Sequence, residues 1–456
     1  MTAEVHQNTS KIGRAAMKGQ LKVSDNQRFL TCEGGAPFFW LADTAWEMLH
    51  CLTREETEHY MGVRSKQGFN VLQTVILSEF DGLREPNAYG RVPLLKNTKD
   101  QYDPTMPDLS GEYSYFDHLD FTLECAERHD MYVALLPTWG DKFSRCWGVG
   151  PEIFTPENAY TYGEFLGARY KNTPNIVWVL GGDRLLEKFE HFDVIKNMAD
   201  GIKNSGDTHL MTFHPMGPRT SGEQLHDALW LDFNMVQSGH GQAVSCTADM
   251  IASEYARQPA KPVVEGECNY EDYPRCLDSK NGWFDDTDVR LASYWAVFSG
   301  SFGITYGHSS VWSMCDKQRS YVKGNHITHP QSFLKSWEEA LDSPGACQMI
   351  HIKNLILSKN FFDRIPANDD VLAEKYEGAN MQCAVKGKEY IMVYCPNGIK
   401  TTVDLSIFNT KATAQWFDPR TGETIKIEDV LSSGIQSFTP PKSGRNNDYV
   451  LIFSKK

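Results

Sequence analysis

Two acidic residues stand out in this chain because each ends a short apolar segment. The segment NIVWVLGGD ends at Asp183, and the segment KPVVEGE ends at Glu267. Apolar runs that stop at glycine and a carboxylate are typical of buried parallel strands that bring a side chain to one rim of a sheet. Two carboxylates at the mouth of a barrel can hydrolyse a glycosidic bond, one as the acid and the other as nucleophile or base. The pair therefore predicts glycosidase chemistry.

Asp183 is the candidate acid of this pair. A general acid needs a raised pKa, which an apolar setting near Trp178 or Trp139, or the charge of a second carboxylate, would provide. Gly181 and Gly182 precede it and would let backbone and ligand approach closely. The alternative is that Asp183 caps a helix that begins with RLLEKF. The two roles are compatible.

Glu267 is the preferred partner among three neighbouring acids. A period of 2 along a strand places Glu265 and Glu267 on the same face. Glu267 lies nearer the carboxyl-terminal rim, where barrel enzymes place their chemistry. Glu265, one layer deeper, is a candidate to pair with a base inside the barrel, and Glu271 falls in the following loop as a candidate sugar ligand. A structural ion pair is the alternative role for Glu267.

Other strand ends carry polar and aromatic side chains that are expected to bind a sugar at the same rim. The predicted substrate-binding residues are Asp43, Trp46, Gln73, Trp139, Lys142, His214, Arg219, His240, Glu271, Tyr306 and Trp312. His214 and His240 end consecutive strands and could form a metal site, but no HExxH motif or close His/Asp set accompanies them. We therefore expect no metal and no cofactor.

A galacturonate in the substrate would need a cationic partner for its carboxylate. Lys142 and Arg219, in the loops after the third and fifth strands, are the best-placed candidates, and Arg275, after the seventh strand, is a third. The alternative for each of them is a solvated surface charge.

The composition limits the partners and the class of protein. A chain of 456 residues with 41% hydrophobic and 23% charged residues fits a soluble globular protein made of a large barrel and a smaller module. A net charge of −14 argues against nucleic acid or an anionic membrane surface as a partner. Eleven cysteines without CxxC spacing indicate free, mostly buried thiols. An oligo- or polysaccharide is the expected partner.

No segment reaches the ~20 apolar residues that a membrane helix needs. The first twenty residues, MTAEVHQNTSKIGRAAMKGQ, lack the apolar core of a signal peptide. If a signal peptide has been removed, the protein would act in the periplasm or at the cell surface. The sequence leaves both the compartment and the oligomeric state open.

Eight short apolar segments recur along the first 350 residues, each followed by a helix-like stretch. They are FFWLADTAW from Phe38, FNVLQTVIL from Phe69, MYVALLPTWG from Met131, NIVWVLGGD from Asn175, HLMTFHPMG from His209, FNMVQSGHG from Phe233, KPVVEGE from Lys261 and FGITYG from Phe302. A capping box at Thr53 and Glu56 predicts the start of one helix. Eight strand–helix alternations predict an α/β fold, a (β/α)8 TIM barrel over residues 38–350.

The segments on either side of the predicted barrel have a different pattern. Residues 351–456 contain short strands separated by Gly, Asn and Pro turns, which predicts an antiparallel β-sandwich domain that buttresses the barrel. Residues 1–37 are predicted to form an N-terminal extension and a hairpin around Gly34 and Gly35. This hairpin is expected to close the bottom of the barrel.

Several of these motifs together resemble a known family. The stretches LADTAWEMLHCLTREETEHYMGVRSKQGFNVLQTVI, NIVWVLGGD, KPVVEGECNYE and GSFGITYGHSSVW are similar to those of the bacterial apiosidase-like family, glycoside hydrolase family 140. The resemblance spans nearly all of residues 20–456. It implies a (β/α)8 barrel followed by a β-sandwich, and an activity on apiose-linked side chains of the pectin rhamnogalacturonan II.

The resemblance also implies roles for the two carboxylates. Asp183 matches the acid/base position of the family, and Glu267 matches the nucleophile position of a retaining enzyme. Related retaining barrels commonly end the fourth strand in Asn-Glu, whereas this chain has Gly182 and Asp183. The shorter acid must therefore lie closer to the glycosidic oxygen, or the substrate must lie deeper.

Three other functions compete with this interpretation. The first is a glycosidase that acts on another plant or host glycan. The second is a carbohydrate- or matrix-binding protein whose barrel has lost its activity. An inactive barrel would not need Asp183 and Glu267 to face one pocket. The third is a metal-dependent hydrolase built on His214 and His240.

Overall fold

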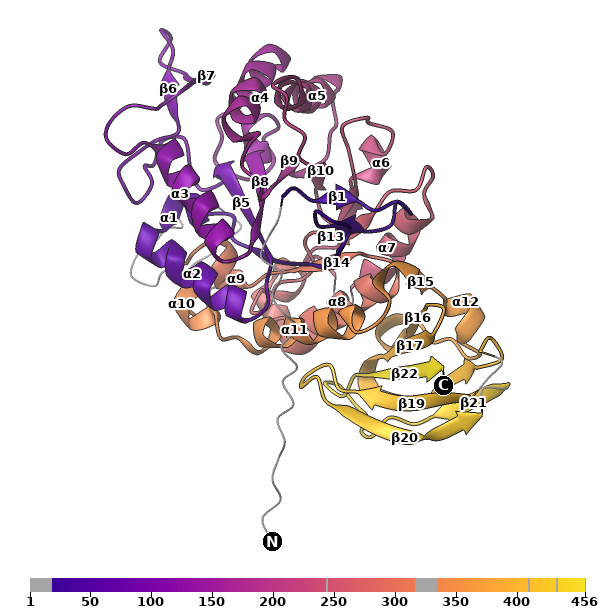
Figure 1. Ribbon diagram of the computed structural model, residues 1–456. Coiled ribbons are helices and arrows are strands. Elements are labelled where there is room, and N and C mark those ends of the chain that lie inside the picture. Colours follow the sequence, from indigo (N-terminus) through magenta and orange to yellow (C-terminus); the bar gives the residue numbers. More distant parts are fainter. Residues whose placement is uncertain (1–18, 243–244, 316–333, 409–410, 432–433, 456) are drawn as a thin grey trace.

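The computed structural model describes residues 19–242, 245–315, 334–408, 411–431 and 434–455. Within these ranges the chain forms a barrel followed by a smaller β-domain (Figure 1). The polar segment for which no signal peptide was predicted lies largely in residues 1–18, outside the described residues.

All eight predicted segments form strands of one sheet, which confirms the barrel prediction. In chain order the barrel strands are β4 (Trp40–Thr44), β5 (Val71–Leu77), β8 (Tyr132–Thr138), β9 (Ile176–Arg184), β10 (Met211–Pro215), β12 (Asn234–Gln237), β13 (Val263–Glu265) and β14 (Gly303–Tyr306). Neighbouring strands pair in parallel in the order β10-β9-β8-β5-β4-β14-β13-β12. Their buried apolar side chains form the core. The carboxyl ends therefore meet at one rim.

The ring is completed between β10 and β12. The backbone N–H of Asp232 donates to the carbonyl of Met211 at 2.8 Å. The hydroxyl of Thr212 donates to the carbonyl of Phe233 at 2.6 Å. A short strand, β11 (Arg219–Thr220), pairs with β12 in the antiparallel direction.

Helices cover the outside of the barrel (Figure 1). The longer ones are α2 (Arg54–Lys66), α3 (Tyr115–Arg128), α4 (Pro156–Tyr170), α5 (Phe189–Asn204), α7 (Thr247–Ala256), α8 (Asp286–Phe298) and α11 (Pro344–Leu357). Among the described residues, the one-turn helices of the barrel are α1 (Met48–Cys51), α6 (Gly222–Leu225), α9 (Ser309–Trp312) and α10 (Trp337–Ala340), and α12 (Asn368–Val371) lies in the C-terminal domain. Helix α2 begins at the predicted capping box, where Thr53 and Glu56 each bind the other's backbone N–H. Among the described helices, none has the length and apolar character needed to cross a bilayer.

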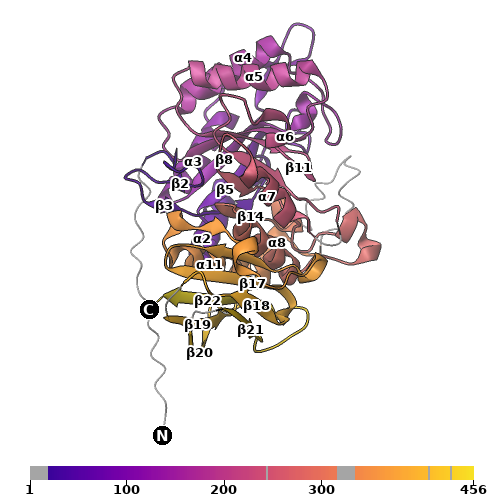
Figure 2. The same ribbon diagram turned by 90° about the vertical axis from the view of Figure 1, so that its right-hand side faces the viewer.

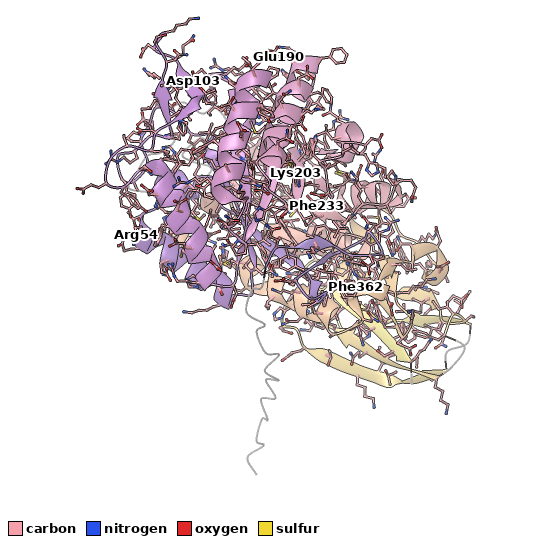
Figure 3. The ribbon with its side chains drawn as sticks, turned by 45° about the horizontal axis from the view of Figure 1, so that its top comes forward. Arg54, Asp103, Glu190, Lys203, Phe233 and Phe362 are labelled. Atoms are coloured by element: carbon pink, nitrogen blue, oxygen red, sulfur yellow. The ribbon has the colours of Figure 1, made fainter. Side chains whose placement is uncertain are left out.

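Two small hairpins accompany the barrel. The N-terminal one pairs β2 (Leu30–Thr31) with β3 (Pro37–Phe38), and β1 (Lys22–Val23) adds a third strand to it. The other pairs β6 (Leu94–Lys96) with β7 (Tyr102–Pro107) and extends outward from the barrel. Asp103, labelled in Figure 3, marks this second hairpin.

The C-terminal domain is an antiparallel sandwich, as the turn-rich sequence predicts. Its strands are β15 (Ile365–Pro366), β16 (Cys383–Lys386), β17 (Tyr390–Cys395), β18 (Thr401–Asp404), β19 (Lys411–Phe417), β20 (Thr424–Leu431), β21 (Ile435–Phe438) and β22 (Tyr449–Lys455). Six of them form the sheet β15-β16-β17-β22-β19-β20, and β18 pairs with β21. Val393 and Leu451 of the larger sheet share a buried core with Val403 and Phe438 of the smaller one.

The sandwich packs directly against the barrel (Figure 2). The buried guanidinium of Arg290, on α8, binds both carboxylate oxygens of Asp448, with N–O distances of 2.7 and 2.9 Å. Beside this pair, the rings of Tyr294 and Tyr394 stack with centroids 4.8 Å apart. Phe362 lies at the same junction (Figure 3). Buried charges and rings thus join the two domains.

Candidate active site

Two glycines shape the end of β9, where the first candidate carboxylate lies. Gly181 and Gly182 have φ angles of 98° and 86°. A Cβ at Gly181 would lie 2.7 Å from the carbonyl oxygen of His214, and a Cβ at Gly182 would lie 2.8 Å from the backbone nitrogen of Gly140. A larger residue would therefore clash with the neighbouring chain on either side. The glycines let the end of β9 fit between the third and fifth barrel strands.

Asp183 follows them in the same left-handed region, with φ of 58°. It belongs to β9, and the helix that follows, α5, is capped by Lys188, so the helix-cap alternative is wrong. Its backbone N–H donates to Nδ1 of His214 at 3.3 Å, and its Oδ2 accepts a short hydrogen bond from the indole N–H of Trp147. Aspartate adopts this conformation more readily than most residues, and the two partners fix its backbone and its carboxyl at the end of the strand.

The pKa of Asp183 is raised above its ordinary value. Burial is the main cause, and the nearby negative charge of Glu267 adds to it. Arg184, His214 and the hydrogen bond from Trp147 act in the opposite direction but do not cancel the shift. The carboxyl is therefore a better proton donor near neutral pH than an exposed aspartate would be.

Glu267 lies between two histidines. Nε2 of His240 lies 3.0 Å from Oε1, and Nε2 of His214 lies 3.2 Å from Oε2. In both rings Nδ1 accepts a backbone N–H at 3.3 Å, from Asp183 for His214 and from Tyr270 for His240. The ring hydrogen must then be on Nε2, facing Glu267. Glu267 thus faces two N–H donors.

These donors decide the charge of Glu267. Burial by itself would raise its pKa, but His214 and His240 outweigh burial and lower the pKa to about 2. Glu265 behaves in the opposite way, because burial raises its pKa to about 8. Its Oε1 accepts the backbone N–H groups of Ser238 and Glu267, each at 3.2 Å. Glu265 therefore lies beneath Glu267 and supports its backbone.

A cavity of about 260 Å³ brings Asp183 and Glu267 together at the carboxyl-terminal rim. Four other predicted residues line it as well: Trp46, Trp139, His240 and Trp312. The remaining lining residues are Glu79, Trp147, Gly217, Pro218, Gln237, Gly239, Gly241, Tyr270, Tyr273 and Leu277. The wall is thus mainly aromatic, with a few polar groups, as in a sugar-binding pocket.

Two predicted sugar-binding residues, on the first and second barrel strands, do not line the cavity. Asp43 is fully buried and accepts hydrogen bonds from the hydroxyl of Tyr60 at 2.6 Å and the guanidinium of Arg64 at 2.5 Å. The amide of Gln73 donates to the carbonyl of Gly266 at 2.9 Å. Both side chains make hydrogen bonds inside the barrel, and the bond from Gln73 is to the residue just before Glu267.

The three predicted cations are also outside the cavity lining. Lys142 is buried, with its ammonium 2.7 Å from the carboxylate of Asp141. Arg219 is exposed, and its guanidinium lies 3.4 Å from the carboxylate of Glu223. Arg275 pairs with Asp288, near the sandwich. Each cation therefore already has an acidic partner of its own.

The last three predicted ligands have internal partners. Glu271 accepts a hydrogen bond from the hydroxyl of Tyr306 at 2.7 Å and from the N–H of Gly345 at 3.2 Å. His214 contacts Glu267 from outside the cavity lining. Within the described residues, neither His214 nor His240 belongs to a group of three close metal-ligating side chains. Their shared partner is a carboxylate.

Ten of the lining residues escaped the sequence analysis, and four of them show why. Glu79 lies two positions beyond the end of β5, and burial together with neighbouring carboxylates raises its pKa to about 8. Gln237 is the last residue of β12, so its strand-end position was a usable signal. Trp147 and Tyr273 come from long loops, where spacing alone gives no signal.

Comparisons with known proteins identify the family. A family model described as "Apiosidase-like, catalytic domain" matches residues 24–363, and a model named for collagen binding matches residues 365–454. A solved structure titled glycoside hydrolase is 32% identical, covering 96% of this chain and 97% of its own, with a TM-score of 0.85. A family 5 glycoside hydrolase from Bacteroides vulgatus has the same identity and TM-score, covering 96% and 94%. No curated protein matched. The chain is a glycosidase and belongs to the apiosidase-like family.

Proposed function

We propose that this glycosidase releases apiose-linked side chains of rhamnogalacturonan II by a retaining mechanism. Asp183 is the acid/base and Glu267 is the nucleophile. The main support is the opposite shift of two carboxyl groups that line one cavity. The pKa of Asp183 is raised and that of Glu267 is lowered to about 2. Such a pair supplies a proton donor and an anion at the same pH.

The reaction runs in two steps. A carboxylate oxygen of Glu267 attacks the anomeric carbon while the bond to the leaving oxygen breaks. The electron pair stays on that oxygen, which takes the proton of Asp183. Water then attacks the same carbon, Asp183 takes a proton from it, and Glu267 leaves as a carboxylate. The two histidine donors stabilise Glu267 as an anion before the first step and after the second.

The cavity favours a neutral sugar between the two carboxylates. None of its described lining residues is Lys or Arg. The indole N–H groups of Trp139 and Trp312 and the amide oxygen of Gln237 are buried, and none of them has a hydrogen-bond partner among the described residues. They offer neutral donors and an acceptor for sugar hydroxyls, whereas a uronate would lie unpaired beside Glu267. Apiose meets this requirement, and a galacturonate in the leaving group must lie outside the cavity lining.

The substrate prediction has a direct test. Rhamnogalacturonan II fragments that carry an apiose-linked side chain are expected to lose it, and proton NMR should show the first-formed sugar in the anomeric configuration of the substrate. Two aryl glycosides test this directly. The value of kcat/KM for 4-nitrophenyl apioside should exceed that for 4-nitrophenyl galacturonide by about 100-fold or more, because the described cavity lining offers no cation to pair with the carboxylate of the uronide. Comparable cleavage of the uronide would contradict the neutral-sugar assignment. An inverted product would contradict only the retaining mechanism.

The pH dependence of kcat/KM follows from the same two carboxyls. Activity needs Asp183 protonated and Glu267 ionised. Because the pKa of Glu267 is lowered to about 2, the acidic limb should lie at very low pH. Activity should fall as the pH rises through the raised pKa of Asp183, so the alkaline limb lies above the ordinary aspartate value of ~3.9. Measuring kcat/KM with 4-nitrophenyl apioside across the stable pH range checks this. An alkaline limb near ~3.9 would contradict it.

A further inference from the structure

Trp147 contacts the candidate acid in a way that its position in the chain does not reveal. It lies in the loop that follows β8, beyond the short helix η1 (Gly140–Lys142). Its indole N–H donates a short hydrogen bond to Oδ2 of Asp183, and both residues line the cavity. The contact joins the loop after the third barrel strand to the end of the fourth barrel strand.

The loop that carries Trp147 is fixed by the residue next to Asp183. The buried guanidinium of Arg184 donates to the carbonyl of Ser144 at 2.6 Å, to the carbonyl of Asp183 at 2.7 Å and to the carbonyl of Trp147. Its Cζ atom also lies 5.6 Å from the centre of the Trp147 ring. The same arginine therefore fixes the backbone of both the indole donor and the carboxyl acceptor.

This contact makes the two oxygens of Asp183 different. An indole nitrogen can only donate a hydrogen bond, and a protonated carboxyl accepts best at its carbonyl oxygen, because its hydroxyl oxygen is the weaker acceptor. When Asp183 is protonated, its hydrogen is therefore on Oδ1. We propose that Trp147 is a positioning residue that directs the proton of Asp183 to Oδ1, the oxygen that serves the leaving group. The inference rests on the proposed role of Asp183 as the acid/base.

The proton balance in the first step follows from this assignment. As the bond between the anomeric carbon and the leaving oxygen breaks, its electron pair stays on that oxygen. The hydrogen of Oδ1 moves to the same oxygen, and Asp183 becomes a carboxylate. Oδ2 keeps its hydrogen bond from Trp147 throughout, and this bond strengthens as negative charge develops on Asp183. In the second step, Oδ1 takes the hydrogen back from water.

Replacing Trp147 by Phe keeps an aromatic ring and removes the N–H donor. For methyl apioside, whose poor leaving group needs full protonation, kcat/KM is expected to fall about tenfold to a hundredfold. For 4-nitrophenyl apioside, whose leaving group needs little protonation, the loss should stay within about threefold. Because the lost hydrogen bond lowers the pKa of Asp183, the alkaline limb of the variant should move to higher pH.

Trp312→Phe is the matched control, because Trp312 lines the same cavity but has no hydrogen bond to Asp183. It should weaken both apiosides by a similar factor and leave the alkaline limb in place. If Trp147→Phe behaves in the same way, Trp147 only shapes the cavity and the proposal is wrong.

A measurement without substrate separates this inference from the proposed function. With indole-15N tryptophan, the protein has only 11 tryptophan signals, and the one absent from Trp147→Phe belongs to Trp147. Its N–H shift should titrate with pH in the wild type and stop titrating in Asp183→Asn. If the Trp147 N–H shift does not titrate in the wild type, or titrates equally in Asp183→Asn, the contact between Trp147 and Asp183 is wrong. A titrating signal in a protein that cleaves neither apioside would instead overturn the proposed substrate and leave the contact standing.

Discussion

Glu267→Gln is expected to lower kcat/KM on apiose-linked substrates by about 10⁴-fold or more, because the amide cannot act as the nucleophile. The loss should appear mainly in kcat. The variant should fold but lose some stability, since Glu267 faces Nε2–H donors of both His214 and His240. A glutamine offers one oxygen, so one donor would face the amide nitrogen. We expect a cost of about 1–3 kcal/mol in unfolding free energy, measurable by urea denaturation.

Glu265→Gln is the matched control for this prediction. Glu265 lies two residues away, its pKa is raised to about 8, and its Oε1 accepts two backbone N–H groups. A neutral glutamine keeps that acceptor, so the variant should stay within about tenfold of wild type. If Glu265→Gln is inactive and Glu267→Gln is active, the nucleophile is Glu265. With Glu267→Ala, added azide should restore turnover and give a glycosyl azide of inverted configuration.

The barrel was predictable because its strands are buried on both faces. The run from Ile176 to Leu180 contains only apolar residues, and all five are buried. A continuous apolar run that ends at glycine and a carboxylate can be recognised as a buried strand from its own residues, without information from the rest of the chain. The sandwich was predictable for a related reason, since its short strands are separated by strong turn residues. Both signals are local.

The ion pairs that bury Asp43 and Lys142 were not predictable from the positions of these residues along the chain. Asp43 was expected at the substrate, but Arg64, on α2, reaches back to it and neutralises it in the core. Lys142 was expected to bind a galacturonate, but its buried ammonium pairs with the neighbouring Asp141. Strand position does not reveal which oppositely charged neighbour is present, because that depends on how helices and loops fold back.

The loop residues of the cavity escaped prediction for a different reason. Trp147 reaches Asp183 because Arg184 fixes its loop through backbone carbonyls. Such contacts depend on main-chain atoms, which every residue has, and leave no composition signal. His214 and His240 were correctly placed at strand ends, but their common partner, Glu267, appears only when the seventh strand lies beside them.

Asp448→Ala is expected to lower the free energy of unfolding by about 3–5 kcal/mol, because it leaves the buried charge of Arg290 without its main partner. Arg290 is fully buried and Asp448 is 1% exposed. Tyr394 also donates to Asp448, at 3.1 Å, so a second polar group loses its acceptor. Urea denaturation followed by tryptophan fluorescence measures the loss. Because the pair joins α8 to the sandwich, its loss should also separate the unfolding transition into two steps.

Two further variants test whether the buried charge of Arg290 causes the loss of stability in Asp448→Ala. Asp369→Ala removes an exposed partner of Lys375 in the same domain and should cost less than about 1 kcal/mol. Combining Asp448→Leu with Arg290→Met removes both charges and should recover part of the stability lost in Asp448→Ala. A cost for Asp448→Ala as small as that for Asp369→Ala would show that other contacts hold the domains together. Failure of the double variant to recover would point to lost hydrogen bonds, because the neighbours of Arg290 and Asp448 would still lack partners.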